Sequence, residues 1–151
     1  MENKQIAERF YSFANLMEIR GEDAFRVRSY RNAAEVIETW TKPLRIMAAE
    51  EGAKGLTSIP GIGRAISAKI LDLLETGTFE AWEKLTAETP ETVLELLSLN
   101  GVGIKTATTL HTKFKINSLA DLRLFVEGGG LEMVDGIGDK GALRIKQSLQ
   151  Q

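Results

Sequence analysis

The stretch SIPGIGRAI at residues 58–66 decides the fold, because the chain repeats its pattern as LNGVGIKTA at residues 99–107 and VDGIGDKGA at residues 134–142. Each copy holds one apolar residue between two glycines, and we call these turns the first (61–63), second (101–103) and third (136–138) hairpin. An apolar segment precedes each copy and an amphipathic segment follows it. The repeat therefore predicts a helix, a tight glycine turn and a second helix, three times along the chain.

Apolar residues recur at intervals of three and four through most of the sequence, and the alternation typical of strands is nearly absent. This spacing predicts helices over residues 6–17, 30–40, 44–47, 66–74, 79–85, 93–97, 106–114, 118–125 and 138–149. Gly21, Gly52 and Gly77 are expected to end the first, third and fourth of these helices. Thr89 and Pro90 are predicted as N-cap and first residue of the helix through Leu97, Ser118 with Asp121 as a capping box, and residues 128–130 as a loop. The predicted fold class is all-α, built from short helices.

Composition removes several classes of protein. The 151 residues suit one domain or two small ones, and 43% hydrophobic with 26% charged residues is typical of a globular protein. Cysteine is absent and His111 is the single histidine, which excludes disulfides, thiolate metal sites, His-based metal sites and a Ser/His/Asp triad. No apolar run approaches the roughly 20 residues of a membrane span. We expect a cytoplasmic, nucleoid-associated monomer without a membrane partner.

The net charge of −2 is unusual for a nucleic-acid binder, but the charges are segregated along the chain. Residues 52–71 contain no carboxylate and three cations, and residues 96–120 contain no carboxylate and three lysines. The six cations are Lys54, Arg64, Lys69, Lys105, Lys113 and Lys115. Between these stretches lie seven acids opposed only by Lys84: Asp72, Glu75, Glu80, Glu83, Glu88, Glu91 and Glu95. Positive charge therefore surrounds the first two hairpins.

Two glycines in one turn permit a positive φ and remove the side chains that would block a close approach. The helix after the turn presents free N–H groups and the positive end of its dipole, which suits a phosphate oxygen without any base being read. A single copy could instead be a helix C-cap with a packing glycine, but three copies make that alternative less favourable. The third hairpin is weaker, because Asp135 and Asp139 flank it. The predicted DNA-binding residues are Gly61, Ile62, Gly63, Arg64, Gly101, Val102, Gly103, Lys105, Gly136, Gly138 and Lys140.

Three further clusters each allow a functional role and a plain structural role. Arg26, Arg28 and Arg31, with Tyr30 among them, are candidates to hold a 5′-phosphate rather than to form an ordinary solvated surface. Trp40 and Trp82 fall on apolar stripes, which favours a place in the core over stacking on bases. His111 with its neighbouring lysines fits a solvated basic helix end better than a catalyst.

The whole chain resembles the N-terminal region of bacterial and archaeal family X DNA polymerases, the relatives of DNA polymerase beta. AFRVRSYRNAA (24–34) and IPGIGRAISAKI (59–70) are similar to the small 8-kilodalton lyase domain, residues 99–110 to its partner hairpin, and residues 136–149 to an additional hairpin of the bacterial branch. The resemblance implies three helix-hairpin-helix motifs in a polymerase-beta-like N-terminal fold. It also implies two domains, residues 1–87 and 88–151.

The resemblance carries further expectations about chemistry. Lys69 matches the lysine that forms a Schiff base in 5′-deoxyribose-phosphate lyases, and Tyr30 matches a tyrosine near it. Ala65 and Ala68 depart from the family by replacing a phosphate-binding lysine and an acid, and Arg26 replaces another lysine. No cofactor is required, although a structural monovalent cation could be held by carbonyls of Thr57, Ile59 and Ile62 and of Leu97, Leu99 and Val102.

Polymerase catalysis needs clustered carboxylates for two metal ions, and no acid-x-acid triplet occurs in the chain. We therefore expect a DNA-binding protein rather than a polymerase, either free-standing or the N-terminal fragment of a family X polymerase. The expected ligand is gapped or 5′-phosphorylated DNA in repair, with a polymerase or repair protein as a further partner. Two alternatives stay open: a protein-interaction scaffold that kept the fold and lost DNA binding, and a lyase acting through Lys69.

Overall fold

The computed structural model describes residues 1–151, which form helices joined by turns and contain no strand. The elements in chain order are α1 (Asn3–Ile19), α2 (Ala24–Thr39), α3 (Leu44–Thr57), α4 (Arg64–Thr76), α5 (Glu80–Glu88), the 3₁₀ helix η1 (Glu91–Ser98), α6 (Ile104–Phe114), α7 (Leu119–Glu127), the 3₁₀ helix η2 (Gly130–Met133) and α8 (Gly138–Leu149). The all-α prediction is confirmed.

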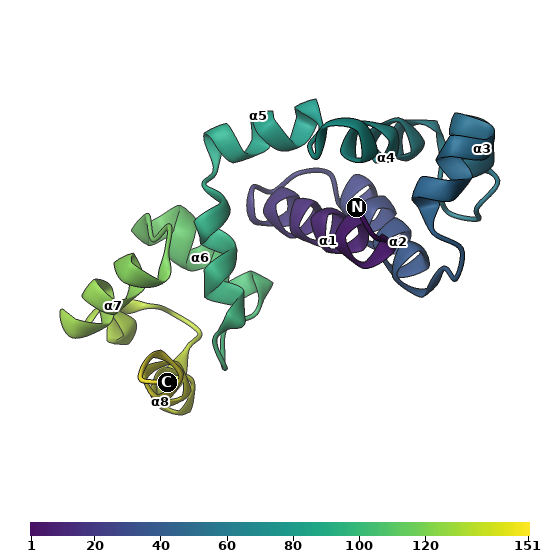
Figure 1. Ribbon diagram of the computed structural model, residues 1–151. Coiled ribbons are helices and arrows are strands. Elements are labelled where there is room, and N and C mark those ends of the chain that lie inside the picture. The colour runs from purple at the N-terminus through teal and green to yellow at the C-terminus, as the bar shows by residue number, and fades with distance from the viewer.

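α1 contacts more of the other helices than any other element does. It lies along α2 and also contacts α5, η1 and α6, while α7 and α8 lie at the far end of the molecule from α3 (Figure 1). The stripe Ile6, Phe10, Phe13 and Met17 is buried, as the spacing predicts. Because α1 contacts elements on both sides of residue 87, one core runs through the chain, and the division into two domains stays a prediction.

Glycine ends one helix where the sequence predicts it and interrupts another. Gly77 takes the left-handed conformation at φ +82 and its N–H donates to the carbonyl of Leu73, which ends α4. Gly52 (φ +61, ψ −145) interrupts α3, and a further helical turn to Thr57 then leads into the first hairpin. The interruption re-aims the chain between α2 and α4.

The segment around Pro90 corrects the prediction for this region. Thr89 does not cap the following helix: its N–H still donates to the carbonyl of Leu85 in α5, and its hydroxyl accepts a hydrogen bond from Arg20 at 2.8 Å. Pro90 is the N-cap instead, and η1 is a 3₁₀ helix whose first bond joins Val93 N–H to the Pro90 carbonyl.

The predicted cap of α7 is formed in part, and both tryptophans pack against the core as predicted. Ser118 caps α7 by accepting a hydrogen bond from Asp121 N–H at 3.1 Å, although the Asp121 carboxylate bonds Asn117 N–H instead of Ser118. Trp82 is buried, and Trp40 is half-buried against the core. Neither ring is therefore free to stack on a base.

Candidate nucleic-acid interface

The first and second hairpins have nearly the same backbone conformation. Gly61 and Gly101 both have φ +91, a value that side chains rarely adopt. Each turn is closed by a hydrogen bond from the apolar residue between the glycines, Ile62 N–H to Ile59 O (3.0 Å) and Val102 N–H to Leu99 O. Ile62 and Val102 are buried, so each turn is anchored to the core through its middle residue.

The second glycines of these two hairpins open the following helices. Gly63 (φ −87, ψ −173) and Gly103 (φ −97, ψ −175) are extended N-caps without a capping side chain. The first bonds of the helices join Ser67 N–H to Gly63 O and Ala107 N–H to Gly103 O, both at 2.9 Å. The N–H groups of the three residues after each glycine have no acceptor in the protein, and a Cβ at either glycine would meet open space. Each turn thus presents a cluster of free donors that an anion can approach closely.

The third hairpin departs from this geometry. Gly136 has φ +90 like its counterparts, but Gly138 has φ +68 and already lies in α8, whose N-cap is Ile137 in a helical conformation. The bond from Ile137 N–H to Val134 O, which would close the turn, is not formed. Ile137 is correspondingly only half-buried. The sequence template is shared, whereas the turn is not.

α8 of the third motif packs against the turn of the second hairpin. A Cβ at Gly101 would lie 3.4 Å from side-chain atoms of Arg144 and Ile145 in α8, and Asn100 N–H donates to Ser148 Oγ at 3.1 Å. On the other side, a cleft of about 260 Å³ separates the turn at residues 135–137 from α6. The two motifs therefore form a tandem unit in which α8 supports the second hairpin from behind.

The charged side chains also differ between the first two hairpins and the third. Arg64 and Lys105 are exposed beside the open donors and make no ion pair, and Lys140 is also exposed and unpaired. Next to the third hairpin, Lys146 bonds Glu132 at 3.0 Å. This hydrogen bond holds the pKa of Glu132 below its ordinary value, with smaller contributions from a backbone hydrogen bond and the positive charge of Lys146.

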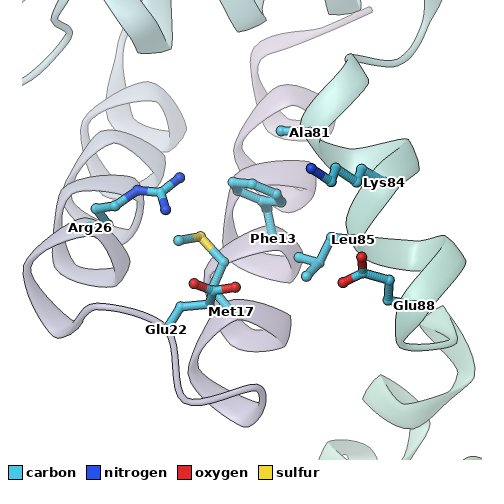
Figure 2. A pocket seen from close by; sticks show the side chains of 8 residues that line it. All are labelled: Phe13, Met17, Glu22, Arg26, Ala81, Lys84, Leu85 and Glu88. Atoms are coloured by element: carbon cyan, nitrogen blue, oxygen red, sulfur yellow. The ribbon is translucent and has the colours of Figure 1, made fainter.

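The arginines of α2 do not all converge. Arg31 is occupied inside the protein, because its guanidinium bonds Glu18 (2.8 Å) and Asn15 (2.7 Å). Arg28 is exposed, 5.9 Å from the ring centroid of Phe25. Arg26 reaches into a half-open pocket of about 280 Å³ between α2, α1 and α5 (Figure 2).

That pocket has an apolar floor and mixed charges at its rim. Phe13, Met17 and Leu85 form the floor, and Arg26 and Lys84 approach from opposite walls (Figure 2). The two carboxylates of the rim, Glu22 and Glu88, are both paired with Arg20, at 4.0 and 2.7 Å. The rim therefore keeps two cations without an ion pair.

Lys69 and Tyr30 are brought together as the resemblance implies. The Lys69 ammonium lies 5.7 Å from the ring centroid of Tyr30 and 5.9 Å from that of Phe79, and no carboxylate pairs with it. Tyr30 itself is buried against the aromatic cluster of α1. Ala65 and Ala68 are exposed on the same helix as Lys69.

Sequence reasoning missed Phe25. Its ring is 74% exposed in the first turn of α2, beside Arg26 and Arg28. The available signal was that Phe25 stands off the buried stripe of its helix, which runs through Val27, Tyr30 and Ala34. A large aromatic ring off the apolar stripe is a candidate for contact with a ligand.

The carbonyls expected to hold a cation differ in their bonding. Those of Thr57, Ile62, Leu97 and Val102 accept no hydrogen bond, whereas those of Ile59 and Leu99 accept the bonds that close the turns. A carbonyl with a second lone pair can still coordinate an ion, so the cation stays a prediction. No group of three or more His, Asp or Glu side chains is arranged for a metal, and His111 Nδ1 bonds the Asn117 side chain at 2.8 Å.

Comparison with known families assigns the fold. Residues 1–79 match the model described as a helix-hairpin-helix domain, and residues 93–151 match the SAM-like helix-hairpin-helix tandem. The chain belongs to the helix-hairpin-helix domain family. None of the helices combines the length and the apolar character that crossing a bilayer requires.

Curated relatives place this domain in a polymerase context. The chain is 28% identical over 149 residues to the DNA polymerase/3′-5′ exonuclease PolX of Bacillus subtilis (strain 168), a match that covers 99% of the chain and 25% of that protein. It is 32% identical to DNA polymerase lambda of Rattus norvegicus (80% of the chain, 20% of that protein) and 35% identical to that of Arabidopsis thaliana (74% and 20%). The homology is to the N-terminal region of family X polymerases, and the chain spans a quarter or less of these relatives. Family and homology together indicate DNA binding in a polymerase context.

Proposed function

We propose that this chain binds the DNA backbone without reading sequence, with the first and second hairpins each holding phosphates on one side of a gap or bend. The observation that carries the proposal is the shared geometry of these hairpins, in which φ +91 at the first glycine and an extended second glycine leave free N–H donors at the surface. Arg64 and Lys105 stand beside these donors without ion pairs, so that each can add a charge-assisted contact.

The preferred ligand in this proposal is a gapped duplex with a 5′-phosphate, as arises in DNA repair. Arg26 and Arg28 are exposed and unpaired, and they provide the charge for a terminal phosphate. The exposed Phe25 ring, close to Arg28, offers a stacking surface for a base left unpaired at the gap. Arg31 then acts on the fold, through Glu18 and Asn15, rather than on the phosphate.

The test uses Gly63→Ala and Gly103→Ala, because both glycines have a φ that alanine adopts and open space at the Cβ position. The methyl group leaves the fold intact but stands where a phosphate oxygen would approach. We expect each substitution to weaken binding of a labelled, singly gapped duplex about tenfold, measured by fluorescence anisotropy at low salt. Gly128→Ala is the matched control, since Gly128 has φ −84, ordinary packing and a place away from the hairpins.

The same assay tests the proposal further when the salt concentration and the DNA structure are varied. Few phosphates are contacted, so the slope of log affinity against log salt should be about −2 to −4. A duplex with a 5′-hydroxyl at the gap, and an intact duplex, should both bind more weakly than the 5′-phosphorylated gap. Equal binding by wild type, Gly63→Ala and Gly103→Ala would refute the proposal and favour the scaffold alternative.

A second candidate function is 5′-deoxyribose-phosphate lyase activity through Lys69. The position of its ammonium beside the Tyr30 and Phe79 rings, with no carboxylate partner, favours this candidate. A neutral Lys69 amine would add to the sugar aldehyde and release water, and the resulting imine is reducible by borohydride. Borohydride trapping on an incised abasic substrate should yield an adduct that Lys69→Ala abolishes and Lys54→Ala retains. No adduct with wild type, or one that persists in Lys69→Ala, would exclude this role.

A further inference from the structure

The two flanks of α8 have different surroundings. One flank, with Gly141, Arg144 and Ser148, lies against the turn of the second hairpin. The opposite flank forms one wall of a groove of about 420 Å³ whose other wall is η2 and the residue after it. The groove is lined by Leu131, Glu132, Val134, Gly138, Asp139, Ala142, Leu143 and Lys146. It therefore lies on the side of α8 away from the proposed DNA contacts.

This groove has an apolar floor and an exposed leucine at its edge, and an exposed methionine is the next residue in the chain after Glu132 of its lining. Leu131, Val134 and Ala142 are buried and form the floor. Leu143 is 56% exposed at the rim, and Met133, which follows Glu132 in η2, is 71% exposed. Large apolar side chains left in water beside a concave apolar surface are typical of protein-interaction sites.

The charge at the rim selects the kind of partner. Among the residues that line the groove, Glu132 and Asp139 are carboxylates. Lys146 is the only cation lining the groove, and it is already paired with Glu132 at 3.0 Å. Asp139 is exposed and makes no ion pair, so the rim repels phosphate and attracts cations.

We propose that the groove between η2 and α8 binds a protein segment that inserts an apolar side chain flanked by lysine or arginine. The apolar floor takes the side chain, and the unpaired Asp139 carboxylate pairs with a flanking cation. Because the second hairpin packs on the other flank of α8, the chain can hold such a partner and DNA at the same time. The inference does not depend on the proposed DNA function.

The probe is a synthetic, acetylated 14-residue helical peptide of leucine and lysine, and its counterpart has glutamate in place of lysine. Binding to the full chain is followed by methyl NMR, with the Met133 ε-methyl and the Leu143 δ-methyls as reporters. We expect saturable shifts centred on these methyls with the lysine peptide only, and an affinity that falls as salt is raised. Shifts centred on the acid-rich residues 72–95, or equal binding of the glutamate peptide, would overturn the proposal.

Matched variants distinguish binding in the groove from nonspecific hydrophobic binding elsewhere on the surface. Leu143→Ser and Met133→Ser should each weaken the lysine peptide by about fivefold to tenfold, whereas Leu124→Ser, which removes an equally exposed leucine outside the groove, should not. Asp139→Asn should weaken it about threefold, and Asp72→Asn should leave it unchanged. All of these residues are exposed, so the variants retain the fold.

Crossed variants distinguish this proposal from that for the hairpins. Peptide affinity, measured without DNA, should be the same in Gly63→Ala and Gly103→Ala as in wild type. A loss of gapped-DNA affinity in folded Leu143→Ser as large as in Gly63→Ala would place the groove on the DNA face and overturn the inference. Loss of the peptide in Leu143→Ser with unchanged DNA affinity is the result expected.

Discussion

The first and third hairpins have the same sequence template and different turns. In the first, the Ile62 N–H closes the turn, the Ile62 side chain is buried, and Gly63 stands extended before α4. In the third, the closing bond is missing, Ile137 is half-buried, and Gly138 has a positive φ inside α8. The second hairpin agrees with the first in each of these features.

The difference has a local cause in packing. In the third motif the Ile137 side chain lies over Gly141, where a Cβ would be only 3.2 Å from Ile137 Cγ2. Ile62 and Val102 instead point into the core and draw their turns closed. Two glycines around an apolar residue therefore permit the phosphate-type turn, but burial of the middle residue decides whether it forms.

Asparagine in place of the first glycine should be much worse in the second hairpin than in the third. Asparagine tolerates a positive φ, so the backbone cost is small at both Gly101 and Gly136. At Gly101 the added side chain meets Arg144 and Ile145 of α8, whereas Gly136 faces open space. We expect Gly101→Asn to lower the free energy of unfolding by about 2 kcal/mol and Gly136→Asn by less than about 1 kcal/mol, measured by urea denaturation.

Gly21→Asn supplies the reference for that measurement. Gly21 has φ +77 with nothing within 4 Å of a Cβ, and it lies far from the hairpins in sequence, so it reports the cost of asparagine at positive φ alone. Equal losses at Gly101 and Gly136 would mean that α8 does not support the second hairpin.

Alanine in place of the second glycine should affect DNA affinity in the first hairpin and stability in the third. At Gly63 it meets a permitted φ, so stability should change little while DNA affinity falls. At Gly138 it meets φ +68, and we expect a loss of about 1 kcal/mol in the free energy of unfolding with little change in DNA affinity. Urea denaturation measures the free energy of unfolding of both variants, and fluorescence anisotropy measures their DNA affinity. A loss of DNA affinity in folded Gly138→Ala as large as in Gly63→Ala would restore the third hairpin to the DNA interface.

Much of this architecture follows from local patterns in the sequence. The spacing of apolar residues and the positions of Gly21, Gly77 and Gly138 place helices close to where they are found, because these signals act within one or two turns. The acids Asp135 and Asp139 at the edges of the third hairpin also predict that this hairpin is a weaker phosphate site than the other two. Charge segregation along the chain correctly places unpaired cations beside the first two hairpins.

What the sequence leaves out depends on distant partners. Arg31 looks like its neighbour Arg28 in the sequence, but α1 brings Glu18 to it and removes it from the surface charge. Arg20 likewise donates a hydrogen bond to the Thr89 hydroxyl, and Pro90 rather than Thr89 is the N-cap of η1. The groove beside Leu143 lies between η2 and α8, which pack against each other. None of these contacts has a signal within one helical turn.

The cations after the hairpins should differ in their contribution to DNA binding. Arg64→Ala should weaken binding about threefold and reduce the magnitude of the salt slope by about 1, because one phosphate contact is lost. Lys140→Ala removes the residue at the corresponding edge of the third hairpin and should change neither quantity. Anisotropy titrations at several salt concentrations measure both. A smaller slope in Lys140→Ala would show that the third hairpin also contacts phosphate.

The smallest effect concerns the ion pair that only the third motif has. Hydrogen bonding from Lys146 lowers the pKa of Glu132 from its ordinary value of 4.5, so the folded state favours the carboxylate. Its contribution to stability is therefore present above the ordinary pKa and is lost as the pH falls through the lowered one. In a carboxyl NMR titration, Lys146→Ala should return the pKa of Glu132 toward 4.5. The Met133 methyl resonance should then no longer show the pH-dependent shift that accompanies the titration of Glu132 in the wild type. The Ile62 and Val102 methyls should show no such step in either protein, since no ion pair adjoins their hairpins. An unchanged titration of Glu132 in Lys146→Ala would mean that the pair does not hold η2 to α8, and the groove would then lose one of its fixed walls.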